Sequence, residues 1–343
     1  MLRRLLLLAL PVLLGSALVA ASGPVPAHAE ERYPEPVLAG NVGDPSVVAV
    51  GKRLVVVATG EQVDRAVKEP GRPWRWTEPV LAERPAWARK GAIWAADLTR
   101  IGDRWVLYFA VPVRGLGPEG RCIGVAVARG PLEVFRPVGT APLVCPARAK
   151  VPAAGDPVAV PGLPSRGVID PSAYEEGGRR YLLYKTDGKP SSVRLLPLNG
   201  AGRKARGPSV ELVRSPGVVE NPVLLRTGGA YYLFASEGDF ARCSYHQTWR
   251  RSTSLTAWAA APQGVLLDRA STGGLCGPGG GDVVVQKGKA TLYFHGWVRR
   301  SSTIPKGGAF WGWNGGEQKA RRAMYAARLV FRSGVPVVKR YLR

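Results

Sequence analysis

The sequence predicts an all-β protein folded as a five-bladed β-propeller, and three observations favour this architecture. Gly and Pro contribute 43 and 30 of the 343 residues without a Gly-X-Y period, which is typical of a chain with many turns. Hydrophobic residues make up 45% of the chain, which is enough for a large core and excludes a disordered protein. Five segments of similar pattern recur at spacings that suit propeller blades.

Each of the five segments begins with a carboxylate, which is followed by an apolar stretch, a turn with Gly and a second apolar strand. This pattern predicts a hairpin. The leading carboxylates are 53, 73, 50 and 62 residues apart, so each interval has room for four short strands. We therefore expect a propeller over about residues 36–340. The five segments are 44–59, 97–110, 170–186, 220–236 and 282–297.

Residues 1–29 have the pattern of a secretory signal peptide. Arg3 and Arg4 precede an apolar run, and Ala27-His28-Ala29 offers small residues at the cleavage positions. A membrane anchor is the alternative, which the prolines and the glycine in or just after the run disfavour. We expect a secreted protein whose mature chain, residues 30–343, is a single domain. Loss of the two arginines lowers the net charge from +23 to +21.

Export would place the four cysteines in an oxidising compartment, where disulfides form. Four cysteines allow three pairings, and the sequence alone does not choose among them. The pairing that closes the shorter loops is Cys122–Cys145 with Cys243–Cys276, and it is the one we expect. The cysteines and histidines do not have the spacing of a zinc site, so the disulfides are interpreted as structural.

The charge balance is strongly basic, with 48 Lys and Arg against 25 Asp and Glu. One interpretation is a solvated surface in an arginine-rich protein. The other is adhesion to an anionic polymer, such as a cell wall or an acidic polysaccharide. Nucleic acid is not an expected partner, because the sequence has no recognised binding motif or basic helix.

The leading carboxylates are the candidates for chemistry. If each begins the innermost strand of its blade, all five face one channel, where like charges shift each other's pKa and separate acid from base roles. The alternative is that each carboxylate caps a turn or pairs with an arginine. Recurrence at the same place in five repeats weakens that alternative. Two of the five open nearly identical segments, Asp44-Pro45-Ser46 and Asp170-Pro171-Ser172, in which proline fixes the backbone after the acid.

In their order along the chain, Asp44-Pro-Ser, Trp94-Ala-Ala-Asp97, Asp170-Pro-Ser and Val219-Glu220-Asn-Pro resemble glycoside hydrolase family 43. That family consists of five-bladed propellers and includes arabinanases, α-L-arabinofuranosidases and β-xylosidases. The resemblance covers nearly the whole mature chain. It implies that Asp44 is the general base, Glu220 the general acid, and Asp170 the third carboxylate, which holds the acid protonated and oriented. It also implies inversion at the anomeric carbon, for which acid and base lie roughly 6.5–9.5 Å apart.

The sequence departs from the family pattern at two places. Ala96 stands where the family often has proline, and Gly279-Gly280-Gly281 occupies a stretch where many members carry a histidine associated with an axial metal. We therefore expect catalysis to require no cofactor or metal. A structural metal on the propeller axis, such as calcium near His295, stays open, and a hydrogen-bonded core histidine is the alternative.

Aromatic and basic side chains supply candidate substrate contacts. Flat aromatic faces match a sugar ring, although most aromatics in a β protein pack in its core. Arg322 begins a segment that resembles one whose arginine reaches the substrate in the family, and the neighbouring Arg321 leaves the register open. The aromatic candidates also include Trp297 and Trp311. The predicted substrate contacts are Trp94, Asp97, Tyr184, His295 and Arg322.

These observations predict a secreted, inverting glycoside hydrolase, which we expect to be a monomer, acting on arabinose- or xylose-containing polysaccharide or oligosaccharide. The alternative is a catalytically silent propeller that binds carbohydrate or adheres to a cell wall. The presence of all three matched carboxylates favours the enzyme. Another activity on the same fold, such as fructan hydrolysis, also stays open because a fold does not determine a substrate.

Overall fold

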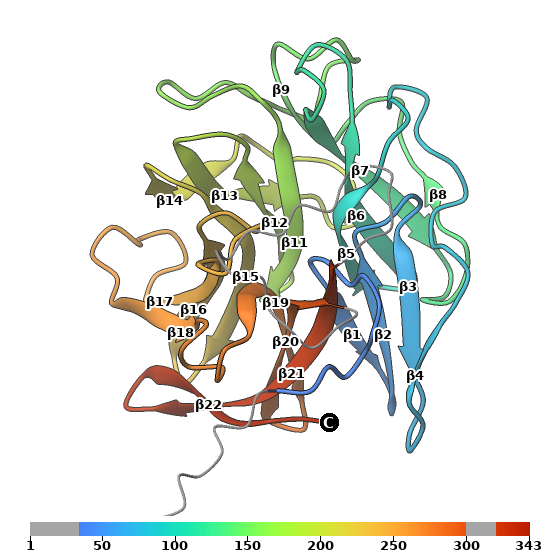
Figure 1. The fold of residues 1–343 in the computed structure, drawn as a ribbon. Coiled ribbons are helices and arrows are strands. Elements are labelled where there is room, and N and C mark those ends of the chain that lie inside the picture. The colour runs from blue at the N-terminus through green and yellow to red at the C-terminus, as the bar shows by residue number, and fades with distance from the viewer. Residues whose placement is uncertain (1–33, 300–319) are drawn as a thin grey trace, which may run out of the picture. The chain divides into compact units, whose positions relative to one another are not determined.

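Five sheets follow one another along residues 34–299 and 320–343, the part of the chain that the computed structural model describes (Figure 1). These ranges contain strands and turns and no helix, and so no helix that could span a membrane. The predicted signal peptide and Trp311 lie outside the described residues. The prediction of an all-β, five-bladed propeller is confirmed.

In four of the blades, four strands lie side by side in chain order, and each pairs antiparallel with the next. The bounds of these strands are β1 (Ser46–Val50), β2 (Arg53–Ala58), β3 (Asp64–Lys68) and β4 (Trp74–Trp76); β11 (Val168–Glu176), β12 (Arg179–Thr186), β13 (Ser191–Leu198) and β14 (Val210–Ser215); β15 (Val219–Thr227), β16 (Ala230–Glu237), β17 (His246–Ser252) and β18 (Gln263–Leu267); β19 (Cys276–Gln286), β20 (Lys289–Arg299), β21 (Ala320–Arg332) and β22 (Val335–Tyr341).

The second blade has six strands, because its outer edge is extended. β7 pairs with β6 on one side and with β8 and β9 on the other, and β10 adds a parallel strand to β9. Its strands are β5 (Trp94–Ile101), β6 (Arg104–Pro112), β7 (Arg121–Ala128), β8 (Arg136–Pro137), β9 (Val144–Pro146) and β10 (Asp156–Val158).

The innermost strands β1, β5, β11, β15 and β19 each contact the innermost strand of the next blade, and β19 closes the ring against β1. The segment before β1 also joins the last blade to the first, because the N–H groups of Val37 and Leu38 donate to the carbonyl of Met324 in β21. Figure 1 shows this closure, with the blue first blade beside the red last strands.

Side chains alternate between the two faces of each strand, so each blade packs against both of its neighbours. On β2, Val55 and Val57 join the core shared with the second blade, whereas Val56 and Ala58 join the core shared with the fifth. Adjacent residues point to opposite faces of a sheet, so one apolar strand supplies two cores. This is why the inner strands read as nearly continuous apolar runs.

Both predicted disulfides are present. Cys122–Cys145 joins β7 to β9 inside the second blade. Cys243–Cys276 joins the loop between β16 and β17 of the fourth blade to the start of β19 in the fifth. The second disulfide therefore ties two blades together at the end of the channel where the inner strands begin.

Candidate active site

A left-handed backbone residue recurs where each inner strand begins. Asp44, Ala95, Asp170 and Asn221 have φ values of 54, 40, 57 and 47°, and Gly280 has 57°. In β5, β11, β15 and β19 this residue and the next form a bulge, across which the pairing register shifts. Such backbone is uncommon outside Gly, Asn and Asp, and it recurs at functional sites.

The five leading carboxylates occupy three different positions relative to this bend. Asp44 and Asp170 are the left-handed residues themselves, Glu220 comes one residue earlier, and Asp97 and Asp282 come two residues later. The expectation that the five acids begin their strands at the same place is therefore wrong. What recurs is the backbone bend, and it divides the acids into two groups with different surroundings.

Asp97 and Asp282 connect neighbouring blades. The Asp97 carboxylate accepts hydrogen bonds from the Ser46 hydroxyl at 2.9 Å and the Ala173 N–H at 3.0 Å, and Asp282 accepts one from the Val47 N–H at 2.7 Å. Burial, followed by the charge of Asp282, raises the pKa of Asp97 to about 7, and burial raises the pKa of Asp282 to about 6. This pair joins neighbouring blades and supports the propeller, which differs from the turn cap or arginine partner of the alternative.

Asp44 is held as a carboxylate. Nη1 of Arg322 lies 3.3 Å from both of its oxygens, and the Thr59 hydroxyl donates to Oδ2 at 2.9 Å. Burial acts to raise the pKa of Asp44, but the Arg322 charge and the Thr59 hydrogen bond hold it below its ordinary value. A carboxylate that stays ionised is suited to accept a proton.

His295 lies behind Asp44 and is fully buried. Its Nδ1 accepts the Asp44 N–H at 3.1 Å, which places the ring proton on Nε2. Burial, with Arg322, lowers the pKa of His295 to about 3, so the ring is neutral. A Cβ at Gly280 would lie 2.5 Å from this ring and 3.0 Å from Asp44 Oδ1, which explains why glycine stands there. His295 supports Asp44 and does not reach the channel as a substrate contact.

The ligand set for an axial metal is incomplete. Nδ1 of His295 accepts a backbone N–H and its Nε2 is buried without a hydrogen-bond partner, but the described residues contain no group of three or more His, Cys, Asp or Glu that could hold a metal ion. His295 is thus a single candidate ligand, and no step below is routed through a metal.

Glu220 and Asp170 form the second carboxylate pair. Lys185 donates to Glu220 Oε2 at 2.7 Å, Tyr245 donates to Oε1 at 2.9 Å, and Asp170 accepts the Asn221 N–H at 3.0 Å. Burial and then the charge of Glu220 raise the pKa of Asp170 well above its ordinary value. Lys185 also pairs with Asp187 at 3.3 Å, so one buried cation is shared among three carboxylates, and the raised pKa of Asp170 favours retention of a proton by the Asp170–Glu220 pair.

A narrow cavity of about 30 Å³ lies on the channel and is lined by residues from all five blades. Asp44, Asp97, Asp170 and Asp282 all border it. A space of this volume has room for a water molecule with several polar partners. The cavity thus places a water-sized space beside the ionised Asp44.

The remaining predicted substrate contacts lie in different surroundings. Arg322 is buried beside Asp44 while Arg321 is exposed, so Arg322 is the arginine of the two that meets a channel carboxylate. Trp94 opens β5, but the Arg121 guanidinium lies 3.0 Å from its ring centroid and covers one face. Tyr184 lies in the core between the second and third blades, hydrogen-bonded to Asp156 and Ser209, and not in the channel.

Sequence reasoning missed Lys185, Tyr245 and Thr59, which contact the catalytic candidates directly. Lys185 carries a detectable signal, because it is a single charge near the end of the apolar run Tyr-Leu-Leu-Tyr-Lys-Thr. A lysine buried within a strand needs an anionic partner.

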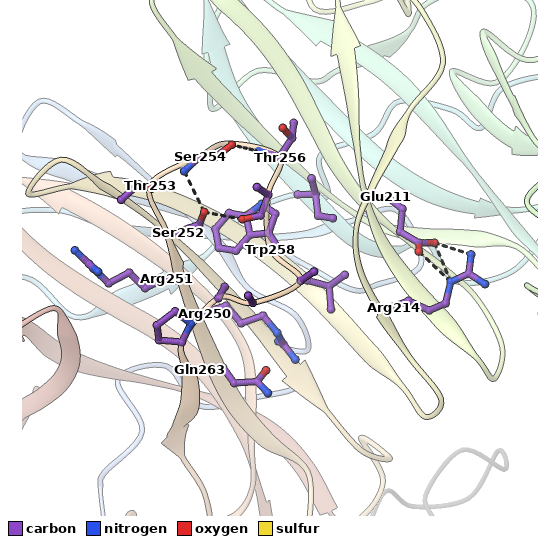
Figure 2. Close-up of a pocket in the computed structure, with 17 residues that line it drawn as sticks. Glu211, Arg214, Arg250, Arg251, Ser252, Thr253, Ser254, Thr256, Trp258 and Gln263 are labelled. Carbon is purple, nitrogen blue, oxygen red and sulfur yellow. Dashed lines mark hydrogen bonds and ion pairs between the residues drawn. The ribbon is translucent and has the colours of Figure 1, made fainter.

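A larger cavity of about 1000 Å³ lies away from the channel, between β14 and the loop that follows β17 (Figure 2). Two of its arginines are paired within the protein, Arg214 with Glu211 and Arg250 with Glu237, whereas Arg251 forms no ion pair among the described residues. Trp258, near its centre, is buried and offers little surface for stacking. None of the predicted site residues lines this cavity, so the channel is the candidate active site.

The sequence profile of glycosyl hydrolases family 43 matches residues 33–314. The chain belongs to glycosyl hydrolase family 43. An extracellular exo-α-(1→5)-L-arabinofuranosidase of Cellvibrio japonicus is 24% identical over 276 residues, which cover 73% of this chain and 72% of that protein. The match to the family extends over most of the propeller, and it makes this chain a glycoside hydrolase.

Solved structures of family members share the fold. An exo-1,5-α-L-arabinanase from a bovine ruminal metagenomic library matches with a TM-score of 0.65 at 19% identity, over 88% of this chain and 97% of that chain. A xylan β-1,4-xylosidase from Bacillus halodurans C-125 matches with a TM-score of 0.64 at 19% identity, over 90% of this chain and 56% of that chain.

Proposed function

We propose that this family 43 protein is a secreted, inverting glycoside hydrolase that cleaves arabinose- or xylose-containing polysaccharide or oligosaccharide. Asp44 is the general base, Glu220 the general acid, and Asp170 the residue that keeps the acid protonated. The observation that carries the proposal is a difference between the channel carboxylates. Asp44 is held ionised, whereas Asp170 and Glu220 form a buried pair beside one cation, Lys185.

The base role rests on the surroundings of Asp44. Its pKa lies below the ordinary value because Arg322 and Thr59 stabilise the charged form against the cost of burial. A water in the adjoining cavity would give up its proton to this carboxylate as its oxygen attacks the anomeric carbon. Arg322 is a positioning residue, because it acts through Asp44.

The acid role rests on the crowding around Glu220. Asp170 and Glu220 are both buried, and a second negative charge in such a pair is opposed by the first. In the cleavage step the proton of the pair lies on Glu220, which gives it to the glycosidic oxygen as the bond from that oxygen to the anomeric carbon breaks, and Glu220 is left as a carboxylate paired with Lys185. Tyr245 and Lys185 hold the two oxygens of Glu220 in place.

The substrate class is supported by relatives. The Cellvibrio japonicus protein is named as an extracellular exo-α-(1→5)-L-arabinofuranosidase, and matching structures include an arabinanase and a xylosidase. The Cellvibrio japonicus protein is described as extracellular, which also supports export of this chain. We therefore place arabinose-containing polymers first among the substrates and xylose-containing polymers second.

The test is a substrate panel followed by product analysis. Linear arabinan, branched arabinan, xylan, and aryl α-L-arabinofuranosides and β-D-xylosides would be offered to the purified enzyme. Proton NMR of the first product should show the inverted anomer, because a single displacement by water forms no covalent intermediate. A retained anomer would contradict the proposed roles. Binding of oligosaccharide without any hydrolysis would instead support the silent, carbohydrate-binding alternative.

A further inference from the structure

The loop of residues 238–245, between β16 and β17, contacts both halves of the proposed site, and we call it the rim loop. At its end, Tyr245 donates a hydrogen bond to Glu220. Near its start, the carbonyl of Phe240 accepts the Nε1–H of Trp297 at 2.7 Å. Between these two points, Cys243 is joined by a disulfide to Cys276 in the fifth blade.

Phe240 is 39% exposed although it lies close to the proposed base. The centroid of its ring is 5.3 Å from Cζ of Arg322, and that guanidinium contacts the Asp44 carboxylate. One side chain therefore separates an exposed aromatic ring from Asp44. Trp297 packs on the same guanidinium at 5.8 Å but is buried, so Phe240 is the ring of this cluster that solvent reaches.

Exposure of a single apolar residue is common and does not by itself indicate a site. The surroundings of Phe240 are what distinguish it. Its backbone is fixed by Trp297, its ring rests on Arg322, and its loop is closed by a disulfide. An aromatic side chain that is held in place and partly exposed, with one arginine between it and the proposed base, is suited to stack on the apolar face of a sugar ring.

We propose that Phe240 is the aromatic platform of a sugar-binding subsite at the channel mouth, and that the Cys243–Cys276 disulfide holds it in position. The ligand is a pentose unit of the substrate chain, bound above Arg322. This inference rests on the proposed function, since it assumes that the channel cleaves a glycoside. Phe240 sets substrate affinity, whereas Asp44 and Glu220 carry the chemistry.

Phe240→Ala should raise KM for the best oligosaccharide of the substrate panel by about tenfold, with a smaller change in kcat. Phe240→Tyr, which keeps the ring, should stay close to the wild type. Trp76→Ala is the matched control, because Trp76 is 38% exposed on β4, at the outer edge of the first blade, and should leave KM unchanged. A KM within twofold of the wild type for Phe240→Ala would overturn the proposal.

The disulfide is tested with a double-mutant cycle. Replacing Cys243 and Cys276 by Ala should raise KM in the protein that retains Phe240. The same replacement should have little further effect on KM in the Phe240→Ala variant, because the disulfide acts on KM by positioning the Phe240 ring. The same KM increase in both backgrounds would overturn the positioning role of the disulfide.

Failure of the proposed function would be seen in different variants from failure of the subsite. If Asp44→Asn and Glu220→Gln keep near-normal rates, the assignment of base and acid fails whatever Phe240 does. If those two variants are inactive and Phe240→Ala has a normal KM, the proposed function stands and the subsite is refuted.

Discussion

Arg322 and Asp44, which are 278 residues apart in the sequence, meet across the junction of the last and first blades, with Nη1 3.3 Å from both carboxylate oxygens. The guanidinium is buried, and its Cζ lies 5.3 Å from the ring centroid of Phe240 and 5.8 Å from that of Trp297. Closure of the propeller thus brings the cation of the fifth blade to the proposed base of the first.

Arg322→Gln should move the acidic limb of the kcat/KM profile to higher pH. Arg322 lowers the pKa of Asp44, and a base works only when it is deprotonated. Loss of an opposite charge at this range raises a pKa by roughly one to three units. The exposed neighbour Arg321 provides the control, because Arg321→Gln should leave the limb in place. An unchanged limb in Arg322→Gln would show that Asp44 is not the titrating base.

Asp170→Asn and Lys185→Met should move the alkaline limb of the same profile in opposite directions. Removing the negative charge beside Glu220 makes loss of the proton easier, so Asp170→Asn should move the limb to lower pH. Lys185 lowers the pKa of Asp170, so its removal should move the limb to higher pH. Circular dichroism would check that both variants fold. Shifts of the same sign would contradict the shared-proton interpretation.

The free energy of unfolding should fall as pH rises from about 5 to 7. Asp97 and Asp282 have pKa values raised from 3.8 to about 7 and about 6, so in this range the folded protein binds more protons than the unfolded chain. Each such carboxyl contributes up to roughly 1.4 kcal/mol per pH unit. Asp97→Asn should therefore make the slope shallower in urea unfolding, whereas the exposed Asp103→Asn should not. Equal slopes in the two variants would argue against burial of a protonated Asp97.

Removal of the Cys122–Cys145 disulfide by paired Ala substitutions should lower the free energy of unfolding by about 3 kcal/mol. The two residues are 23 positions apart, and the chain-entropy model assigns that value to a loop of this length. Chemical denaturation of the variant and the wild type measures the difference. A change below about 1 kcal/mol would mean that the closed loop is already constrained in the unfolded chain.

The hairpins were predictable because apolar runs and Gly turns are local signals, and the blades follow from their spacing. The position of each side chain within a strand was harder to predict. Tyr184 and Lys185 are neighbours on β12, yet Tyr184 enters the core and Lys185 meets Glu220, since adjacent residues point to opposite faces. A register that is wrong by one residue exchanges these two roles.

The backbone bends were also beyond the sequence signal. Ala95 adopts φ of 40° without the side chain that usually marks such a position, and it displaces Asp97 by two residues from the position of Asp44. The Asp-Pro-Ser segments and Val-Glu-Asn-Pro did point to Asp44, which meets Arg322, to Glu220, which meets Lys185, and to Asp170, but not to Asp187, the second carboxylate that pairs with Lys185. Phe240 was missed, because an exposed aromatic in a loop acquires its meaning from Arg322, which is 82 residues away in the sequence.

The most direct test of the central claim compares Glu220→Gln and Asp44→Asn on two substrates that differ in leaving group. Loss of a general acid or base costs roughly 10²–10⁴-fold, so both variants should be slow on the polysaccharide. An aryl glycoside with an activated leaving group needs little protonation, and it should restore much of the rate of Glu220→Gln while leaving Asp44→Asn slow. Restoration of Asp44→Asn, or equal loss in both variants on both substrates, would contradict the assignment of Asp44 as base and Glu220 as acid.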